Sequence, residues 1–446
     1  MSKIAVSKLP VDPGPAAWNA LLPDHPPAQS VQGDLRADWI IIGAGFAGLA
    51  AARRLSQLCP TDQIIVLEAR RVAEGPAGRN SGFLIDLPHD LSSSDYGGAL
   101  AHDVALTHDN RHAIRFAAQM AGDFGMGQSV FDPCGKVNAA ATAKGDAHNR
   151  EYATHLTAMG EPFELLDAKA MRTMTGTDYY RSGLFTAGTV MIQPAAFIRA
   201  AARGLASNRI QIFENSPVTA LERQDGWVAT TPTGTVTAPK VILAVNGHLN
   251  SFGFLKQRLM HVFTYASMTR ALSDVEATKL GGQRVWGVTP ADPMGTTVRR
   301  IPSPQGDRII IRNRFTFNPS MEVDHKRIAR VGRDHDRAFA ARFPMLGDVA
   351  MAHRWGGRLC LSRNNVSAVS EVEEGLFTAC CQNGLGTTRG TLSGMLAAEL
   401  ATQTSSPMLD RALAADAPQK LPPETITRIG AAAHLKWQEF KAGAEL

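Results

Sequence analysis

The sequence contains few cysteines and no long hydrophobic run, and each scarcity argues against a class of protein. Its 446 residues include five cysteines, an odd number with no CxxC pair, so no disulfide framework or zinc site is indicated and a reducing cytoplasm is expected. No stretch reaches the roughly 18 uncharged apolar residues of a membrane helix, and the first residues lack the apolar segment of a signal peptide. The sequence therefore predicts a soluble cytoplasmic protein without a membrane span or a metal site.

The chain also carries little net charge for its length. The formal net charge is +5, and the Lys and Arg residues are scattered along the chain, so nucleic acid is not an expected partner. A solvated basic surface explains this charge better than a preference for anionic small molecules. The chain is too long for one small core, so two domains, interleaved or sequential, are expected. The 40 glycines and 25 prolines favour an α/β architecture over a helical bundle. The composition does not indicate an oligomeric state.

A glycine motif near the amino terminus gives the first functional signal. Residues 39–42 are apolar and β-branched, as in a buried parallel strand, and residues 46–58 have the Ala- and Leu-rich spacing of a helix. Between and within these elements, Gly43 suits a tight turn, Gly45 a close approach of pyrophosphate to the backbone, and Gly48 close packing of helix on strand. The helix would point its free N–H groups and positive dipole end at a phosphate.

An acidic residue completes the motif. Glu68 follows Gly48 by twenty positions and ends the next apolar strand, residues 64–67, where a carboxylate can accept hydrogen bonds from both hydroxyls of an adenosine ribose. The strand, turn, helix, strand and acid together predict a dinucleotide site. They do not distinguish FAD from NAD.

A second glycine-rich segment, residues 75–83, follows almost directly. A simple NAD dehydrogenase usually has a helix at this place, whereas a second loop suits a backbone that must approach the rest of an FAD molecule. With the GAGFAG unit, the LEAR sequence ending at Arg70, and GPAGRNSGF in this loop, the chain resembles the D-amino-acid-oxidase superfamily of FAD-dependent oxidoreductases. More narrowly, it resembles the branch of glycine oxidase, sarcosine oxidase and γ-glutamylputrescine oxidase.

The resemblance extends to three later segments. Val218 occupies the position at which the family places a backbone against adenine. The strand at residues 239–243 leads into a turn that resembles the second cofactor-side strand of the family, and the G-x-G loop opening a helix at 389–402 resembles the one that faces the flavin pyrimidine. Together with the two glycine motifs, the resemblance implies these FAD contacts: Gly43, Gly45, Phe46, Ala47, Gly48, Glu68, Ala69, Arg70, Arg79, Asn80, Ser81, Gly82, Val218, Ala244, Asn246, Gly247, Gly384, Leu385, Gly386, Thr387 and Thr388.

The predicted fold class is α/β, with a Rossmann-like FAD-binding domain and an interleaved α+β substrate domain on a mostly antiparallel sheet. The FAD-binding domain comprises residues 1–93, 188–256 and 355–446, and the substrate domain comprises residues 94–187 and 257–354. Residues 1–37 form an arm, anchored by Trp18 and Leu21. Within the substrate domain we predict a helix at 98–125, a hairpin at 131–141, and, from period-two alternation, antiparallel strands at 257–330 with one face toward a cavity.

The candidate catalytic residues are His89, Tyr265, Arg312 and Arg363. His89 would lead from the flavin toward the substrate, Tyr265 and Arg312 lie on the alternating strands, and an inward arginine would bind a substrate carboxylate. For any one arginine, the solvent face of the sheet is an equal alternative. Arg363 stands in a segment where the family often has an acid and a proline, so this sequence departs from the pattern that selects substrate.

No nucleophilic triad, metal cluster or P-loop is recognisable, so the reaction should be that of the cofactor. The resemblance implies hydride transfer from the carbon beside an amine to flavin N5, with a secondary or γ-glutamylated amine as the favoured substrate and O2 as the favoured acceptor. A flavin monooxygenase that uses NAD(P)H, a dehydrogenase with another electron carrier, and a non-catalytic flavin module are the alternatives. FAD is expected to bind without a covalent bond, since Arg79 stands where some relatives carry a flavin-linked histidine.

Overall fold

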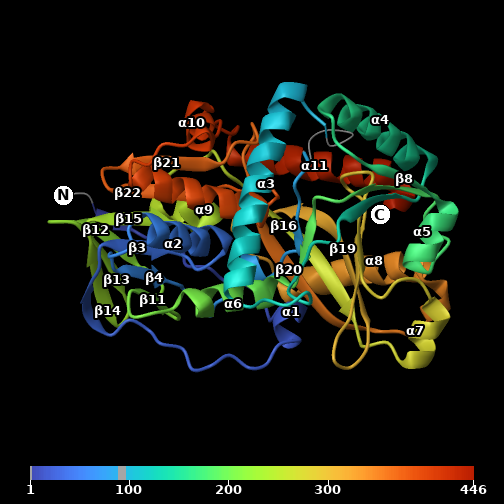
Figure 1. Cartoon of the computed structure of the whole chain (residues 1–446), viewed down its shortest axis with the longest axis horizontal. Helices are drawn as coiled ribbons and strands as arrows, with labels where there is room; N and C mark the ends of the chain where they lie inside the picture. The colour runs from blue at the N-terminus through green and yellow to red at the C-terminus, as the bar shows by residue number, and fades with distance from the viewer. Residues whose placement is uncertain (1–2, 89–96) are drawn as a thin grey trace.

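The structure, a computed structural model, describes residues 3–88 and 97–446 and divides into two regions, each built on a large sheet (Figure 1). The first region lies on the left of the view and carries the glycine motif, while the second lies on the right. The long helix α3 runs between them in this view. No helix in the described part of the chain is long and apolar enough to cross a membrane.

The six-stranded sheet of the first region brings together segments far apart in the sequence. Its order is β11 (Ile210–Phe213), β4 (Ile64–Leu67), β3 (Trp39–Ile42), β15 (Lys240–Leu243), β22 (Leu376–Cys380) and β21 (Ala368–Glu373). All neighbours are parallel except the pair of β21 and β22. Every residue of β3 and β4 is buried, because both faces of the sheet are covered, as a parallel sheet requires.

A smaller antiparallel sheet covers one of those faces. It runs β1 (Lys3–Ala5), β12 (Ala220–Arg223), β13 (Trp227–Thr231), β14 (Gly234–Ala238) and β2 (Gly33–Arg36), with β14 and β2 parallel. Trp227 and its neighbours pack against Ile40 and Ile42 of the larger sheet. β12, β13 and β14 follow one another as an antiparallel meander.

Helices cover the opposite face. α2 (Phe46–Leu58) and α9 (Thr388–Ala401) cross closely, since a Cβ at Gly394 would lie 2.0 Å from the Ala47 carbonyl oxygen. α3 (Leu100–Asp123), α6 (Pro194–Leu205) and the short α1 (Ala17–Ala20) join the same core. A three-stranded sheet of β5 (Phe83–Leu84), β10 (Val190–Ile192) and β6 (Phe131–Asp132), with α10 (Pro407–Ala414) and the short turns η1 (Pro76–Gly78) and η2 (Asn246–Phe252), completes this region.

The second region contains an eight-stranded, mostly antiparallel sheet, as predicted. Its order is β20 (Met351–Leu361), β16 (Met260–Thr269), β19 (Arg308–Phe317), β18 (Thr297–Ile301), β17 (Trp286–Pro290), β7 (Lys136–Ala140), β9 (Ser182–Thr186) and β8 (Glu164–Asp167). Only β17 and β7 pair in parallel. The region's other elements are α4 (Ala143–Met159), α5 (Ala168–Thr175), α7 (Asp274–Leu280), α8 (His325–Arg342), α11 (Glu424–Ala442), η3 (Pro344–Leu346) and η4 (Gly443–Glu445).

The predicted hairpin at 131–141 is wrong. β6 pairs with β10, whereas β7 pairs with β9 and β17. The chain does turn at Gly135, which has φ of +72°, but all five residues of β7 are buried. A strand buried throughout needs partners on both edges, and those partners come from distant parts of the chain.

The five-segment division of the domains stays a prediction. Two features of the structure bear on its last boundary, between residues 354 and 355. This boundary falls within β20, whose residues pair with β16 along its length. The chain's end also contacts the second region, because the Glu445 carboxylate accepts hydrogen bonds from the N–H groups of Ala141 and Thr142, both at 2.9 Å.

Candidate active site

Two glycines, Gly43 in the turn between β3 and α2 and Gly48 within α2, leave no room for a side chain. Gly43 has φ of +105°, and a Cβ there would lie 2.6 Å from the Ala244 carbonyl oxygen. A Cβ at Gly48 would lie 1.8 Å from the Gly43 carbonyl oxygen. The tight turn at Gly43 and the close packing at Gly48 agree with the roles that the sequence predicts for them.

Gly45 differs, because a Cβ there would clash with nothing and Gly45 borders an open space. The nearest atom to a Cβ there would be the Ala77 Cβ, 3.6 Å away. Gly45 is also the N-cap of α2, and no side chain caps this helix. The first-turn N–H groups and the positive end of the helix dipole therefore suit an anion in that space.

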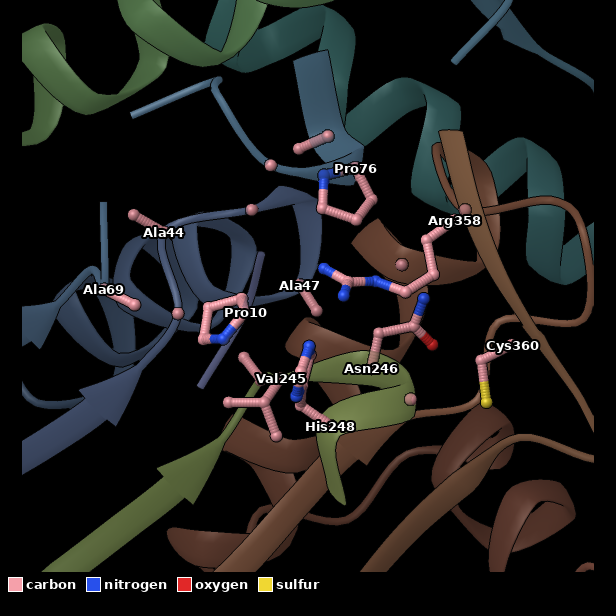
Figure 2. A pocket seen from close by; sticks show the side chains of 18 of the residues that line it. Pro10, Ala44, Ala47, Ala69, Pro76, Val245, Asn246, His248, Arg358 and Cys360 are labelled. Atoms are coloured by element: carbon pink, nitrogen blue, oxygen red, sulfur yellow. The ribbon is translucent and has the colours of Figure 1, made fainter. Parts of the chain in front are cut away.

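This space is part of a first cavity, with about 1550 Å³ free of protein atoms and partly open to solvent. It extends from the β3–α2 turn to the start of α9, and Figure 2 shows side chains converging on it. Most of the predicted FAD contacts line it: Gly43, Gly45, Phe46, Ala47, Glu68, Ala69, Arg70, Arg79, Asn80, Val218, Ala244, Asn246, Gly247, Gly384 and Gly386.

Glu68 is fixed at the end of β4 by the backbone. Its carboxylate accepts hydrogen bonds from the N–H groups of Ala44, at 2.9 Å, and Arg70, at 3.1 Å. Burial raises the pKa of Glu68, and these two bonds oppose the rise. A carboxylate oriented in this way keeps acceptor capacity for donors such as ribose hydroxyls.

The second glycine loop is held in place by hydrogen bonds that its carbonyl groups accept and that the Arg79 side chain donates. Arg79 is 3% exposed, and its guanidinium donates to the Glu74 carbonyl at 2.7 Å and the Gly356 carbonyl at 3.2 Å, so it is not a surface charge. The Arg79 carbonyl accepts from the Trp355 indole at 3.0 Å. The Asn80 carbonyl accepts from the Trp18 indole at 2.8 Å, which makes Trp18 an anchor of the arm, as predicted.

Arg299 supports the end of this loop. Its guanidinium donates to the carbonyls of Ser81 and Gly82, both at 3.0 Å, and of Ile192 at 2.8 Å. Gly82 has φ of +78°, and a Cβ there would lie 2.1 Å from Arg299 Nη1. Gly82 therefore packs on Arg299 and does not line either cavity described in this section.

The start of α9 lies where the two glycine loops meet. Gly384 has φ of +83°, the Thr387 hydroxyl donates to the Phe83 carbonyl at 2.5 Å, and no side chain caps the helix. Thr388 is fully buried and its hydroxyl has no partner within the described residues. The positive end of this helix would stabilise negative charge on a reduced flavin.

A second cavity adjoins the first and shares Asn80, Gly384 and Gly386 with it. Its walls come from the second glycine loop, the α9 loop and the strands β17, β18 and β19: Asn80, Ser81, Phe83, Ile85, Thr289, Pro290, Pro293, Thr297, Arg312, Gly384, Leu385, Gly386 and Thr387. Thr297 and Arg312 are cross-strand partners, so they share one face of the sheet. Of the described residues that line this cavity, Arg312 is the one with an ionisable side chain.

The other candidate catalytic residues are not brought together with Arg312. The Tyr265 hydroxyl bonds to the Thr316 hydroxyl at 2.6 Å, and its ring packs against Ile328 and Val331 of α8. Arg363 is exposed beyond β20, and neither residue lines either cavity. His89 lies outside the described residues.

Sequence reasoning missed several polar residues of the first cavity, among them Asp12, His248, Thr264 and Arg358. Asp12, His248 and Thr264 each present a buried side-chain atom without a partner among the described residues, and Arg358 points into the cavity in Figure 2. Buried polar atoms are normally hydrogen-bonded, so these atoms fit a site that holds a polar ligand. With the open face of Gly45 and the oriented Glu68 carboxylate, the residues present fit FAD.

The described residues include no group of three or more His, Cys, Asp or Glu side chains arranged to hold a metal ion. All five cysteines are free, and three of them, Cys360, Cys380 and Cys381, are buried in one hydrophobic cluster. Cys360 lines the first cavity. A hydrogen bond to Cys381 and burial raise its pKa well above the usual thiol range.

Three buried histidines predict a loss of stability in acid. Burial and nearby Arg354 lower the pKa of His335 to about 3, and burial beside Arg358 lowers the pKa of His248 to about 3 and of His261 to about 4. The folded protein thus binds fewer protons than the unfolded chain, whose histidines titrate near 6.5. The free energy of unfolding should fall by about 1 kcal/mol per histidine for each pH unit below that value, levelling off near the folded pKa values.

Urea unfolding across this pH range measures the effect. His335, whose Nδ1 lies 2.7 Å from the Ser267 hydroxyl, is the residue to replace with Gln. The variant should be less stable at neutral pH and show a shallower dependence on acid. A pH dependence as steep as that of the unsubstituted protein would contradict the assignment.

The chain was compared with known proteins. The DAO family model, described as FAD dependent oxidoreductase, matches residues 38–400. A probable oxidoreductase OrdL from Rhizobium meliloti is 26% identical over 411 residues, which cover 89% of this chain and 90% of the relative. The γ-glutamylputrescine oxidoreductase of Escherichia coli is 24% identical over 389 residues, with coverage of 84% and 86%.

The fold is similar to that of a solved glycine oxidase from Geobacillus kaustophilus. The TM-score is 0.68 at 18% identity, over 84% of this chain and 96% of the other. The mixed α/β architecture predicted from the sequence is therefore confirmed.

Proposed function

The chain belongs to the family of FAD-dependent oxidoreductases, and on that premise we propose that it oxidises the carbon–nitrogen bond of an amine or amino acid. The observation that carries this proposal is the second cavity, which adjoins the predicted flavin end of the FAD site and contains Arg312. It has about 590 Å³ free of protein atoms. A cavity of this kind suits a small polar substrate held beside the cofactor.

FAD would supply a hydride acceptor for the carbon next to an uncharged amine nitrogen. An amine that has lost this hydride is an iminium ion, which water hydrolyses to a carbonyl compound and a protonated amine or ammonium. The residues of the chain orient the substrate and provide a positive electrostatic field. Arg312 holds one end of the substrate, while the loop from Asn80 to Ser81 and the α9 turn enclose the reacting end. The amino end of α9 supplies a positive field without transferring a proton.

Arg312 also indicates the substrate class. A guanidinium can bind a carboxylate through two parallel hydrogen bonds, and the remaining walls contribute hydroxyl, amide and apolar groups. We favour a secondary amine or a γ-glutamylated amine, which carries a carboxylate at a distance from its amine. The likeness to a γ-glutamylputrescine oxidoreductase supports this choice.

We further propose that FAD is bound without a covalent bond and that the protein is cytoplasmic. Cys360 is the cysteine that lines the first cavity, and its raised pKa keeps it a neutral thiol, which is a poor nucleophile. The five free cysteines agree with a reducing compartment.

The identity of the electron acceptor is tested by product analysis in air. With a turned-over amine, we expect one hydrogen peroxide for each carbonyl product, because two electrons pass from each C–H bond to O2. Carbonyl formation that requires an added dye or quinone and yields no peroxide would make the protein a dehydrogenase. Oxidation of NADPH in the absence of amine, at a comparable rate, would favour a flavin monooxygenase.

A further inference from the structure

Arg358 stands out among the charged residues of the first cavity. It lies on β20, is 6% exposed, and its side chain points into the cavity toward Ala47 in the first turn of α2 (Figure 2). Within the described residues, its guanidinium has two acceptors, the Met321 carbonyl at 3.1 Å and Asp12 Oδ2 at 3.5 Å. A guanidinium carries five N–H donors, so these acceptors leave donors for a ligand.

The other cations that line the cavity are more firmly bonded. Lys8 pairs with Glu322 at 2.7 Å and Arg70 with Glu74 at 3.2 Å, while Arg79 is bonded to backbone carbonyls. Arg358 has the longest of these ion pairs. It is therefore the cation that can bind an anion at the smallest loss of existing contacts.

Asp12 supplies a second, independent observation. It belongs to the arm, is 5% exposed, lines the cavity, and its Oδ1 has no partner among the described residues. The arm is held on both sides, by the hydrogen bond from Ser7 N–H to the Ser251 carbonyl and by Arg79 to the Pro13 carbonyl. A buried carboxylate with one unsatisfied oxygen and a distant cation is costly, which indicates that this part of the cavity is built for further polar contacts.

FAD has one strongly anionic group, its pyrophosphate. The N–H groups of α2 are neutral donors, and Gly45 leaves room for close approach, but neither provides a counter-charge. We propose that Arg358 binds the pyrophosphate of FAD from the side opposite α2. This inference rests on the use of FAD and is independent of which amine is the substrate.

Titration of the apoprotein with FAD and with ADP, the half of FAD that carries the pyrophosphate, tests the proposal. Arg358→Met should weaken the binding of both ligands by about tenfold to a hundredfold, the usual range for a lost charge-assisted bond. Arg358→Lys should restore part of the affinity. The matched control is Arg354→Met on the same strand, because Arg354 pairs with Asp336 at 2.8 Å and should leave both affinities unchanged.

Three results would overturn the proposal. Equal FAD affinity in Arg358→Met and the unsubstituted protein would exclude the contact, and weaker binding of FAD with unchanged binding of ADP would place Arg358 at the flavin end. If Arg358→Met does not fold, Arg358→Lys still tests the proposal, because lysine keeps the positive charge. Complete loss of ADP binding in Arg358→Lys would then indicate that Arg358 has a structural role. Weaker dependence of ADP affinity on salt in Arg358→Met would support the contact, since one phosphate-binding charge is removed.

Discussion

Replacing Arg312 with methionine is expected to lower kcat/KM for a carboxylate-bearing amine by about 100-fold to 1,000-fold, because a buried carboxylate then loses a two-bonded, charged partner. Arg312 shares one sheet face with Thr297 and is the ionisable residue among the described lining of the second cavity. The loss should appear mainly in KM. The content of bound FAD should not change, because Arg312 does not line the first cavity.

Two controls accompany the Arg312→Met variant: a second substrate without a carboxylate and a second variant on the same strand. An amine of the same shape without the carboxylate should be oxidised equally well by the Arg312→Met and unsubstituted proteins. Arg314→Met is the matched control on β19, since Arg314 pairs with Asp334 at 3.2 Å and Glu439 at 2.9 Å, away from the cavity. An equal loss of activity on both substrates would show that Arg312 does not bind the substrate carboxylate.

Replacing Gly45 with valine is expected to abolish FAD binding while leaving the apoprotein folded. A Cβ at Gly45 would clash with no protein atom, since the nearest, the Ala77 Cβ, lies 3.6 Å away. Because Gly45 lines the first cavity, we expect the added side chain to displace ligand and not protein. We expect the FAD affinity to fall by at least about 100-fold, as for a lost close contact and a blocked helix end. Equilibrium titration with FAD and thermal unfolding of the apoprotein measure the two effects separately.

Gly48→Ala is the informative contrast. A Cβ at this position would lie 1.8 Å from the Gly43 carbonyl, so the substitution should destabilise the apoprotein itself. Gly122→Ala in α3, where a Cβ meets nothing within 4 Å, should change neither property. If Gly45→Val bound FAD as tightly as the unsubstituted protein, the pyrophosphate could not lie at the end of α2.

The first glycine motif was predictable from the sequence because its constraints are local. Gly43 needs a positive φ, a Cβ at Gly48 would meet the Gly43 carbonyl of the same strand–turn–helix unit, and Glu68 accepts a hydrogen bond from the Ala44 N–H in the turn of that unit. The later segments, such as the one that contains Ala244, were predicted only from the resemblance. The structure places that segment beside Gly43 in one parallel sheet.

The residues that sequence reasoning missed depend on pairings over long distances. Asp12 reaches the cavity because the arm crosses it, and Arg358 faces inward because β20 pairs with β16 in a particular register. Alternation alone left each arginine of the sheet, Arg312 included, free to face either side, and the structure places Arg312 at a cavity. Arg363, which was chosen because its segment departs from the family pattern, is exposed. The hairpin at 131–141 failed for the same reason, since a turn does not show which strand its neighbour will pair with.

Anaerobic mixing of the FAD-loaded protein with amines and amino acids tests the central claim most directly. The account predicts that a carboxylate-bearing secondary or γ-glutamylated amine bleaches the visible absorbance of the bound flavin, with one carbonyl product for each flavin reduced, and that NADPH does so far more slowly. Bleaching by NADPH alone, with no amine in the panel able to reduce the flavin, would contradict it.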